Sequence, residues 1–113
     1  MATINTQGGF VYLIENTETM EYKIGLTQSS PEKRVKQLQT GSPARLELRA
    51  SYKSKYPHRL ETLLHRTYST YRLSGEWFAL TQEQVNNFLA KCKETDEIIE
   101  MMKDNPFFGK NLC

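Results

Sequence analysis

Apolar residues recur along the chain with two different periods, and these periods predict strands and helices. Residues 10–14 are continuously apolar and rich in β-branched and aromatic side chains, which is typical of a strand buried on both faces. A polar turn follows, and residues 20–26 predict a second strand that completes an antiparallel hairpin. Gly25 within this strand indicates a bulge or a close approach to the backbone. Residues 46–52 alternate between apolar and polar positions and predict a half-exposed third strand.

Capping residues and apolar spacing predict three helices. The Ser-Pro pair at residues 30–31 begins the first helix, which ends at Gly41. Pro57 opens the second helix, and we expect Gly75 to break it. A capping box at residues 81–84 begins the last helix. The expected apolar positions are Val35 and Leu38 in the first helix, Leu60, Leu63, Leu64, Thr67 and Tyr71 in the second, and Val85, Phe88, Leu89, Cys92, Ile99 and Met102 in the last.

The predicted order of elements is ββαβα, followed by a short extended piece at residues 77–80 and a final helix. This order indicates an α+β fold with a small antiparallel three-stranded sheet flanked by helices. The length of 113 residues suits a single domain, which we place at residues 1–113. We expect its core at residues 10–80, with a C-terminal helix and tail at residues 81–113.

Several classes of protein are excluded by the motifs that the chain lacks. No apolar run approaches the roughly 18 residues that cross a bilayer, and the first residues do not resemble a secretion signal, so we expect a cytoplasmic protein without membrane contact. Cys92 and Cys113 are too few for a disulfide framework or a multi-cysteine zinc site. Glycine-rich nucleotide-binding loops and a Gly-x-Ser-x-Gly motif are also missing, so no organic cofactor is expected.

Positive charge is concentrated in the middle of the chain. Between residues 23 and 72, eleven Lys and Arg residues stand against three Glu residues, a net charge of +8, although the whole chain carries only +2. Such a segment favours a polyanionic partner, while an evenly solvated surface is the alternative. The candidate nucleic-acid contacts are Lys33, Lys36, Arg45, Lys53, Arg66 and Arg72.

Five residues form candidate chemical groups on the predicted elements. His58, Glu61 and His65 share one face of the second helix, where they can hold a transition metal or simply form its solvated side. Glu61 alone suits Mg²⁺, which often takes one or two protein carboxylates and fills its shell with water and phosphate oxygens. Arg34 borders its helix's apolar side, where it can meet a phosphate or face solvent. The apolar neighbours of Tyr12 by themselves predict only an aromatic side chain in the core.

These residues stand in an order that resembles the GIY-YIG endonuclease superfamily. Val11-Tyr12 followed by Lys23-Ile24-Gly25 is similar to the family's paired motif on a β-hairpin. Arg34 in the first helix, Glu61 in the second and the closing run Gly75-Glu-Trp-Phe78 follow in the family's order. The Lys-Ile-Gly variant and the closing run resemble the short branch found in phage proteins and in the meiotically up-regulated gene family.

The resemblance implies cleavage of DNA with Mg²⁺ or Mn²⁺. It implies that Tyr12 helps to deprotonate the attacking water, that Arg34 stabilises charge on the phosphoryl group, and that Glu61 holds the metal ion. His65, one helical turn after Glu61, is similar to a histidine of this branch and can move a proton or orient a metal-bound water. Phosphoryl transfer needs such groups around the attacking, equatorial and leaving oxygens.

Two positions depart from the family's pattern. Lys23 replaces the second tyrosine, and Tyr22 lies beside it on the opposite strand face. Lys23 can supply positive charge, or lower the pKa of Tyr12 if it sits across the hairpin. Glu76 stands where many members carry an asparagine, and it can join the metal shell or bond to the backbone.

Two other functions remain open on the same fold. One is a nucleic-acid-binding module that no longer cuts, which the residues at positions 23 and 76 favour. The other is a regulatory domain that binds a protein through an acidic C-terminal helix. The tail at residues 106–108, Pro-Phe-Phe, can fold onto the core or pair two chains into a homodimer. The acidic residues of that helix are Glu94, Asp96, Glu97, Glu100 and Asp104.

Overall fold

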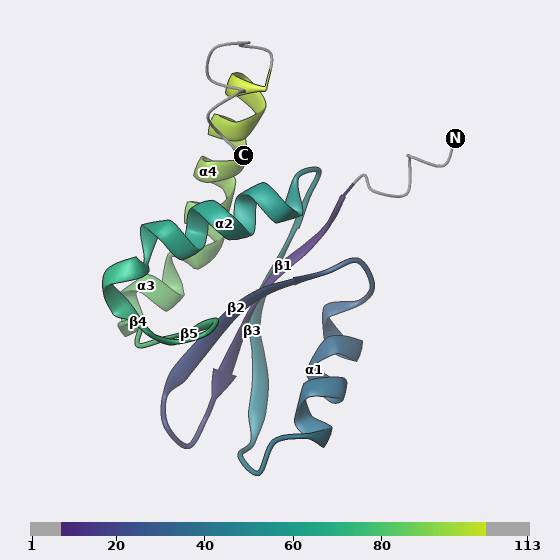
Figure 1. Ribbon diagram of the computed structural model, residues 1–113, viewed down its shortest axis with the longest axis vertical. Coiled ribbons are helices and arrows are strands. Elements are labelled where there is room, and N and C mark those ends of the chain that lie inside the picture. Colours follow the sequence, from purple (N-terminus) through teal and green to yellow (C-terminus); the bar gives the residue numbers. More distant parts are fainter. Residues whose placement is uncertain (1–7, 104–113) are drawn as a thin grey trace.

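The computed structural model describes residues 8–103, so Cys113, Asp104 and the predicted tail at residues 106–108 lie outside the described residues. Within this range the strands and helices follow one another as Figure 1 shows. The strands are β1 (Gly9–Asn16), β2 (Glu21–Thr27), β3 (Leu46–Ser54), β4 (Arg72–Ser74) and β5 (Trp77–Phe78), and the helices are α1 (Pro31–Thr40), α2 (Pro57–Thr67), α3 (Gln82–Asn86) and α4 (Phe88–Met102), with a 3₁₀ turn at Ser69–Tyr71. The α+β class is therefore confirmed.

The sheet contains five strands rather than the three that we predicted. Its order is β3-β1-β2-β5-β4, and every neighbouring pair is antiparallel. β5 pairs with Tyr22 and Lys23 of β2, and β4 folds back onto β5 through Gly75, whose φ of 56° favours glycine. The two extra strands have only three and two residues, so neither is long enough to show an alternating pattern.

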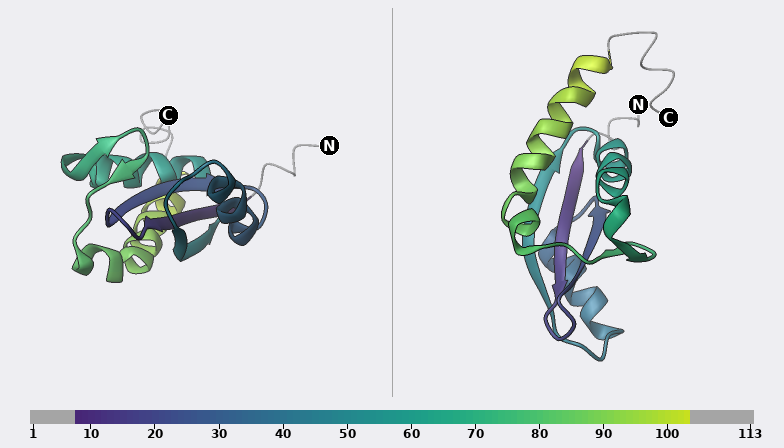
Figure 2. Two further views of the ribbon diagram at one scale, coloured as in Figure 1. Left: turned by 90° about the horizontal axis from the view of Figure 1, so that it is seen from below. Right: turned by 90° about the vertical axis from the view of Figure 1, so that its left-hand side faces the viewer.

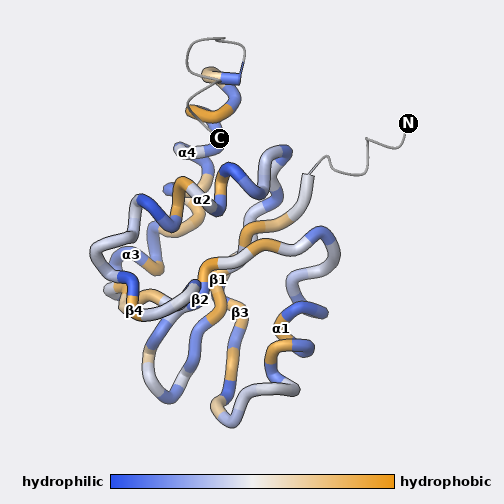
Figure 3. The backbone as a smooth tube through the Cα atoms, viewed as in Figure 1, coloured by the Kyte–Doolittle hydropathy of each residue, from blue (hydrophilic) through white to orange (hydrophobic). Residues whose placement is uncertain are grey.

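The sheet separates two helical layers. α2 and α4 lie against one face and α1 against the other (Figure 2). In Figure 3 the hydrophobic stretches gather at the centre, where β1 and β2 run beside α2. The larger cluster of buried side chains comprises Val11, Leu13, Tyr22, Ile24, Leu60, Leu64, Tyr68, Phe78, Leu80, Phe88, Cys92 and Ile99, and the smaller one beneath α1 comprises Tyr12, Ile14 and Leu46. β1 is buried on both faces, as its sequence predicted.

Helix ends agree with the capping signals at two of three predicted starts. The Ser30 hydroxyl accepts a hydrogen bond from the Lys33 N–H, and Gly41 caps the other end of α1. A capping box joins Thr81 and Gln84 at the start of α3. The start of α2 follows Tyr56, which makes no side-chain cap, although proline occupies the first turn as predicted.

Two predicted helices are shorter than expected. α2 ends at Thr67, and a 3₁₀ turn follows because the Tyr71 N–H donates to the carbonyl of Tyr68. Tyr68 is therefore buried. Thr67 and Tyr71, which we expected among the buried positions of this helix, are exposed. The last helix is interrupted at Asn87, which divides α3 from α4. Among the apolar positions that we predicted for this helix, Phe88, Cys92 and Ile99 are buried, whereas Leu89 is exposed.

No helix in residues 8–103 is long and apolar enough to cross a membrane. Cys92 is buried between the sheet and α2, where desolvation first and the Asp96 carboxylate second raise the pKa of its thiol to about 12.

Candidate functional site

Tyr12 lies directly over Gly25 at the centre of the sheet. The two residues pair across β1 and β2, and the Tyr12 side chain is 1% exposed on the face that α1 covers. A Cβ atom built on Gly25 would lie 2.4 Å from the phenol oxygen of Tyr12, so only glycine leaves room for this ring. The close approach that the sequence predicted at Gly25 is confirmed, and its occupant is Tyr12.

The outer edge of β2 is open beyond Lys23 and gathers groups from two other elements. β5 pairs only with Tyr22 and Lys23, so Ile24 turns its backbone toward α2 and the β4–β5 turn. The Ile24 N–H donates to the carbonyl oxygen of Glu76 at 3.0 Å. The Ile24 carbonyl lies 2.8 Å from His65 Nε2, and because a carbonyl only accepts, Nε2 carries a proton. One residue of β2 thus joins α2 to the β4–β5 turn.

Glu61 lies one helical turn before His65, with 3.9 Å between its Oε2 and His65 Nε2. Its side chain is 18% exposed. Burial, followed by the nearby Glu76 carboxylate, raises the pKa of Glu61, while His65, His58 and Lys23 act in the opposite direction. A half-buried carboxylate that is close to a second one is stabilised by a cation, so the residues present fit a divalent ion.

Lys23 and Glu76 form an ion pair beside Glu61. Their Nζ and Oε1 atoms are 2.8 Å apart, and the two side chains are 15% and 41% exposed. Lys23 Nζ also lies 5.9 Å from the centre of the Trp77 ring. Lys23 pairs with Ile14 and so shares the α1 face of the sheet with Tyr12 and Gly25. A phosphate at this edge would meet a positive charge that the folded protein already holds in place.

Arg34 lies on α1, which packs over the same face. The side chains of Val35 and Leu38 contact the cluster that contains Tyr12. Arg34 is half-buried, and its guanidinium donates to the amide oxygen of Gln37 at 3.2 Å. His58, which shares its helix face with Glu61 and His65, is exposed, and within residues 8–103 no group of three His, Cys, Asp or Glu side chains is arranged to hold a metal ion. A transition-metal site on one face of α2 is therefore not formed there.

Tyr22 points away from this edge. It lies on the opposite face of the sheet, buried in the larger cluster and beside Glu15 and Arg49. Sequence reasoning missed the ion pair between Glu15 and Arg49, although alternation along β1 places Glu15 on the face of Val11 and Leu13, where a buried charge needs a partner.

The six predicted nucleic-acid contacts are all exposed but lie on different elements. Lys33 and Lys36 belong to α1, Arg45 precedes β3, Lys53 lies in β3, Arg66 in α2 and Arg72 in β4. Arg45 is paired with Glu47, and Arg72 donates to the carbonyl of Gly75. Lys33 and Lys36 lie on α1, the helix that follows β2 in the sequence and also carries Arg34.

A family model, that of the T5orf172 domain, matches residues 9–93 of the chain. No curated protein and no solved structure matches it. The matched range contains every element from β1 to the first turns of α4, and with them all the residues placed above at the edge of β2.

Proposed function

The chain belongs to the T5orf172 domain family, and on this premise we propose that it is a divalent-metal-dependent endonuclease that hydrolyses phosphodiester bonds in DNA. The family is consistent with a nuclease-type or DNA-binding function. The observation that supports hydrolysis best is the set of an imidazole, two carboxylates and an ammonium group at the open edge of β2, from His65, Glu61, Glu76 and Lys23. The phenol of Tyr12 lies over Gly25 of the same strand.

Tyr12 and His65 are the groups that can handle the proton of an attacking water. The hydroxyl of Tyr12 makes no hydrogen bond within the described residues, so it is free to accept one from water. The Nε2–H of His65 is held by the Ile24 carbonyl, which fixes the ring and leaves Nδ1 as the nitrogen able to accept a proton. Both groups are positioned by the backbone of β2, and neither depends on a long flexible loop.

Lys23 and Arg34 are the groups that can bind the phosphate. Lys23 supplies a point charge beside Tyr12, and Arg34 supplies a planar guanidinium on the helix that covers the same face. The charge that develops on a phosphoryl group in the transition state is stabilised by such preorganised cations.

Glu61 is the residue that would hold the metal ion, and the carboxylate of Glu76 adds negative charge nearby. A bound divalent ion supplies charge neutralisation and a Lewis acid at the phosphate oxygens. A single glutamate suits Mg²⁺ or Mn²⁺, since these ions retain several waters and take the remaining ligands from the substrate.

The test is cleavage of supercoiled plasmid DNA by the full chain with Mg²⁺ or Mn²⁺, against an EDTA control. Glu61→Gln should lower the rate at least about 100-fold, because the carboxylate that holds the ion is lost. Glu94→Gln, an exposed carboxylate paired with Lys91 on α4, is the matched control and should cut normally. If the folded parent protein leaves the plasmid intact at high concentration, a general nuclease activity is excluded.

A binding module that does not cut is the second candidate, and the Lys23–Glu76 ion pair favours it because the pair occupies both side chains. Such a module would shift DNA in a gel in a strongly salt-dependent way, with or without metal. In that case the parent protein and Glu61→Gln would bind DNA equally well, and neither would cleave it.

The acidic face of α4 gives less support to a protein-binding function. Asp96 accepts hydrogen bonds from Tyr52 and Ser54, and Glu100 accepts one from Tyr56. Glu94 is paired with Lys91. Asp96 and Glu100 therefore attach α4 to the rest of the fold, and Glu94 is already paired within its own helix.

A further inference from the structure

A pocket opens on the face of the sheet opposite to Tyr12, where the β1–β2 hairpin meets α3 and α4. Its volume is about 500 Å³, within the range of pockets that hold small organic molecules. Both the sheet and the helices contribute polar and apolar side chains to its walls. They are Glu15, Met20, Tyr22, Arg49, Ala50, Gln82, Val85, Asn86 and Leu89.

Tyr22 lines the pocket with a hydroxyl that solvent can reach. Tyr22 is 3% exposed, and its hydroxyl makes no hydrogen bond to any residue from 8 to 103. Within those residues no side-chain nitrogen or oxygen is both fully buried and unpaired, so this hydroxyl is reached by solvent, and the pocket is where solvent enters. A tyrosine hydroxyl that bonds only to solvent can exchange its water for a hydrogen-bonding group of a ligand.

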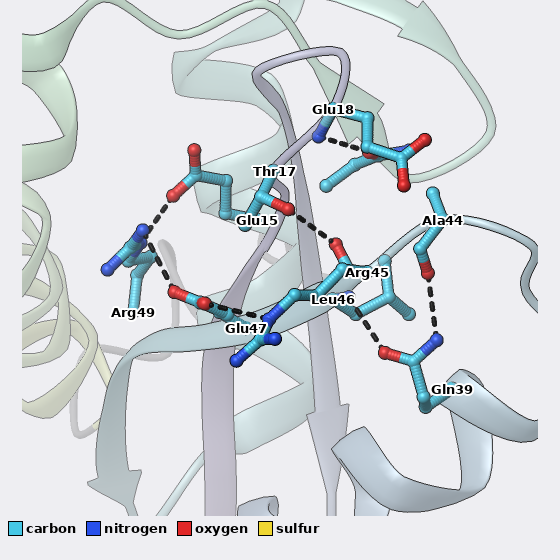
Figure 4. Close-up of polar contacts among 10 residues, drawn as sticks. Glu15, Thr17, Glu18, Gln39, Ala44, Arg45, Leu46, Glu47 and Arg49 are labelled. Atoms are coloured by element: carbon cyan, nitrogen blue, oxygen red, sulfur yellow. Dashed lines mark hydrogen bonds and ion pairs between the residues drawn. The ribbon is translucent and has the colours of Figure 1, made fainter.

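Hydrogen-bond donors and acceptors from other side chains line the same pocket. The Nε of Arg49 donates to Glu15, and a second nitrogen of its guanidinium lies 3.1 Å from a carboxylate oxygen of Glu47. Figure 4 shows the second oxygen of Glu15 and one nitrogen of Arg49 turned away from these contacts. Asn86 accepts from Gln82, which leaves its own amide N–H groups free to donate. The pocket thus presents an acceptor beside several donors.

The charge and the apolar surface of the pocket restrict the class of ligand that it can bind. Glu15, Arg49, Glu47 and Arg45 form an alternating chain of ion pairs with no net charge, so the pocket does not attract a phosphate in particular. Met20, Val85 and Leu89 supply apolar surface, and Met20 and Leu89 are exposed. Apolar walls around a donor-and-acceptor floor suit a flat heterocycle with a polar edge.

We propose that this pocket binds a nucleobase, with its polar edge against Tyr22, Glu15 and Arg49 and its faces against Met20, Val85 and Leu89. Carboxylate, guanidinium and amide side chains are the groups that read base edges elsewhere, and the ring faces of every base are apolar. The base can come from a free nucleoside or from an unpaired nucleotide of a strand. The site lies across the sheet from the edge of β2, and it stands whether or not the chain cleaves DNA.

The test is a titration of the ¹⁵N-labelled full chain with guanosine, adenosine, cytidine and uridine, followed by the amide shifts of residues 20–22, 49–50 and 82–89. Inorganic phosphate is the control ligand, and no metal is added. A single-stranded hexanucleotide is compared with the same strand carrying one abasic position, which separates base from backbone binding. We expect saturable shifts at these amides from a nucleoside or from the intact strand, and weaker ones from the abasic strand.

Two variants identify the contacts. Tyr22→Phe removes only the unpartnered hydroxyl, so it should weaken base binding about two- to tenfold without lowering the melting temperature. Asn86→Ala should weaken binding by a similar factor, while Asn87→Ala, the neighbouring residue outside this pocket, should not.

The proposal is overturned if nucleosides and strands leave these amides unmoved up to the solubility limit. It is also overturned if phosphate or the abasic strand produces the same shifts, or if Tyr22→Phe binds as tightly as the parent. Loss of plasmid cleavage has no bearing on these outcomes, since the readout contains neither metal nor cleavable plasmid.

Discussion

At the scale of single residues, the contact between Tyr12 and Gly25 has the most direct consequences. Sequence reasoning identified Gly25 as a point of close approach because glycine is unfavourable within a strand. It could not identify the group that approaches, since that depends on the register of β1 and β2. The positions of Glu61 and His65 relative to Ile24 could not be predicted either, because they depend on how α2 docks at the strand edge.

The first prediction concerns Gly25→Ala. The added methyl group would lie 2.4 Å from the Tyr12 oxygen, so the ring must move, and we expect a loss of about 1–3 kcal/mol in unfolding free energy together with loss of DNA cleavage. Urea unfolding and plasmid nicking measure the two effects. Gly41→Ala is the control, since a Cβ there meets nothing within 4 Å and φ is −97°. Equal behaviour of the two variants would contradict the role given to Gly25.

The second prediction concerns the ion pair of Lys23 and Glu76. Because both side chains are partly exposed, breaking the pair should change the unfolding free energy by less than about 1 kcal/mol. Lys23→Met should nevertheless slow cleavage about tenfold or more, since a cation at the phosphate is lost. Glu76→Gln should raise the Mg²⁺ concentration needed for half-maximal cleavage. An unchanged metal requirement would mean that Glu76 serves only to hold Lys23.

At the scale of elements, long patterns were predictable and short ones were not. The positions of β1, β2 and α1 follow from the sequence. β1 carries a continuous apolar run, β2 alternates between apolar and other residues, and α1 has a serine cap, a proline and a closing glycine. β4 consists of three exposed residues and β5 of only two residues. β5 is a strand because it pairs with the edge of β2, and β4 is one because it pairs with β5. We did not predict the end of α2 correctly because a 3₁₀ turn follows it, and as a result Tyr68 is buried in the core while Tyr71 is exposed.

The third prediction concerns the attachment of α4 to β3. The Ser54 hydroxyl donates to Asp96 at 2.7 Å and also accepts from the Tyr56 N–H at 2.8 Å, so one buried hydroxyl joins β3, α4 and the start of α2. Asp96→Ala leaves the hydroxyls of Ser54 and Tyr52 without their acceptor and should lower the unfolding free energy by about 1–3 kcal/mol. Thermal unfolding checks this against Glu97→Ala on the same helix. A smaller effect for Asp96 than for Glu97 would show that the contacts are not needed.

At the scale of the whole molecule, the buried ionisable groups predict how stability depends on pH. Burial first, and then the neighbouring Cys92, raises the pKa of Tyr68 from its ordinary value of 10.0 to about 12. The pKa of Cys92 rises from 9.0 to about 12. Between roughly pH 9 and 12 the folded chain therefore holds protons that the unfolded chain has released.

The fourth prediction is that the unfolding free energy falls as pH rises through this interval, by at most about 1.4 kcal/mol per pH unit for each group. Tyr68→Phe removes one of the two groups and should make the decline shallower, whereas Tyr71→Phe removes an exposed phenol and serves as control. Urea unfolding at pH 8, 9.5 and 11 measures the slopes. Parallel slopes for Tyr68→Phe and the parent protein would contradict the prediction.

Trp77 gives the molecule a built-in optical probe. It is the chain's single tryptophan, and Lys23 Nζ lies 5.9 Å from the centre of its ring. The emission of an indole responds to a charge placed over its ring, so any anion that draws Lys23 away should change the fluorescence of the unlabelled protein. Stopped-flow mixing with DNA could then follow the arrival of a phosphate at Lys23 in real time, before any bond is broken, and Lys23→Met would supply the silent reference.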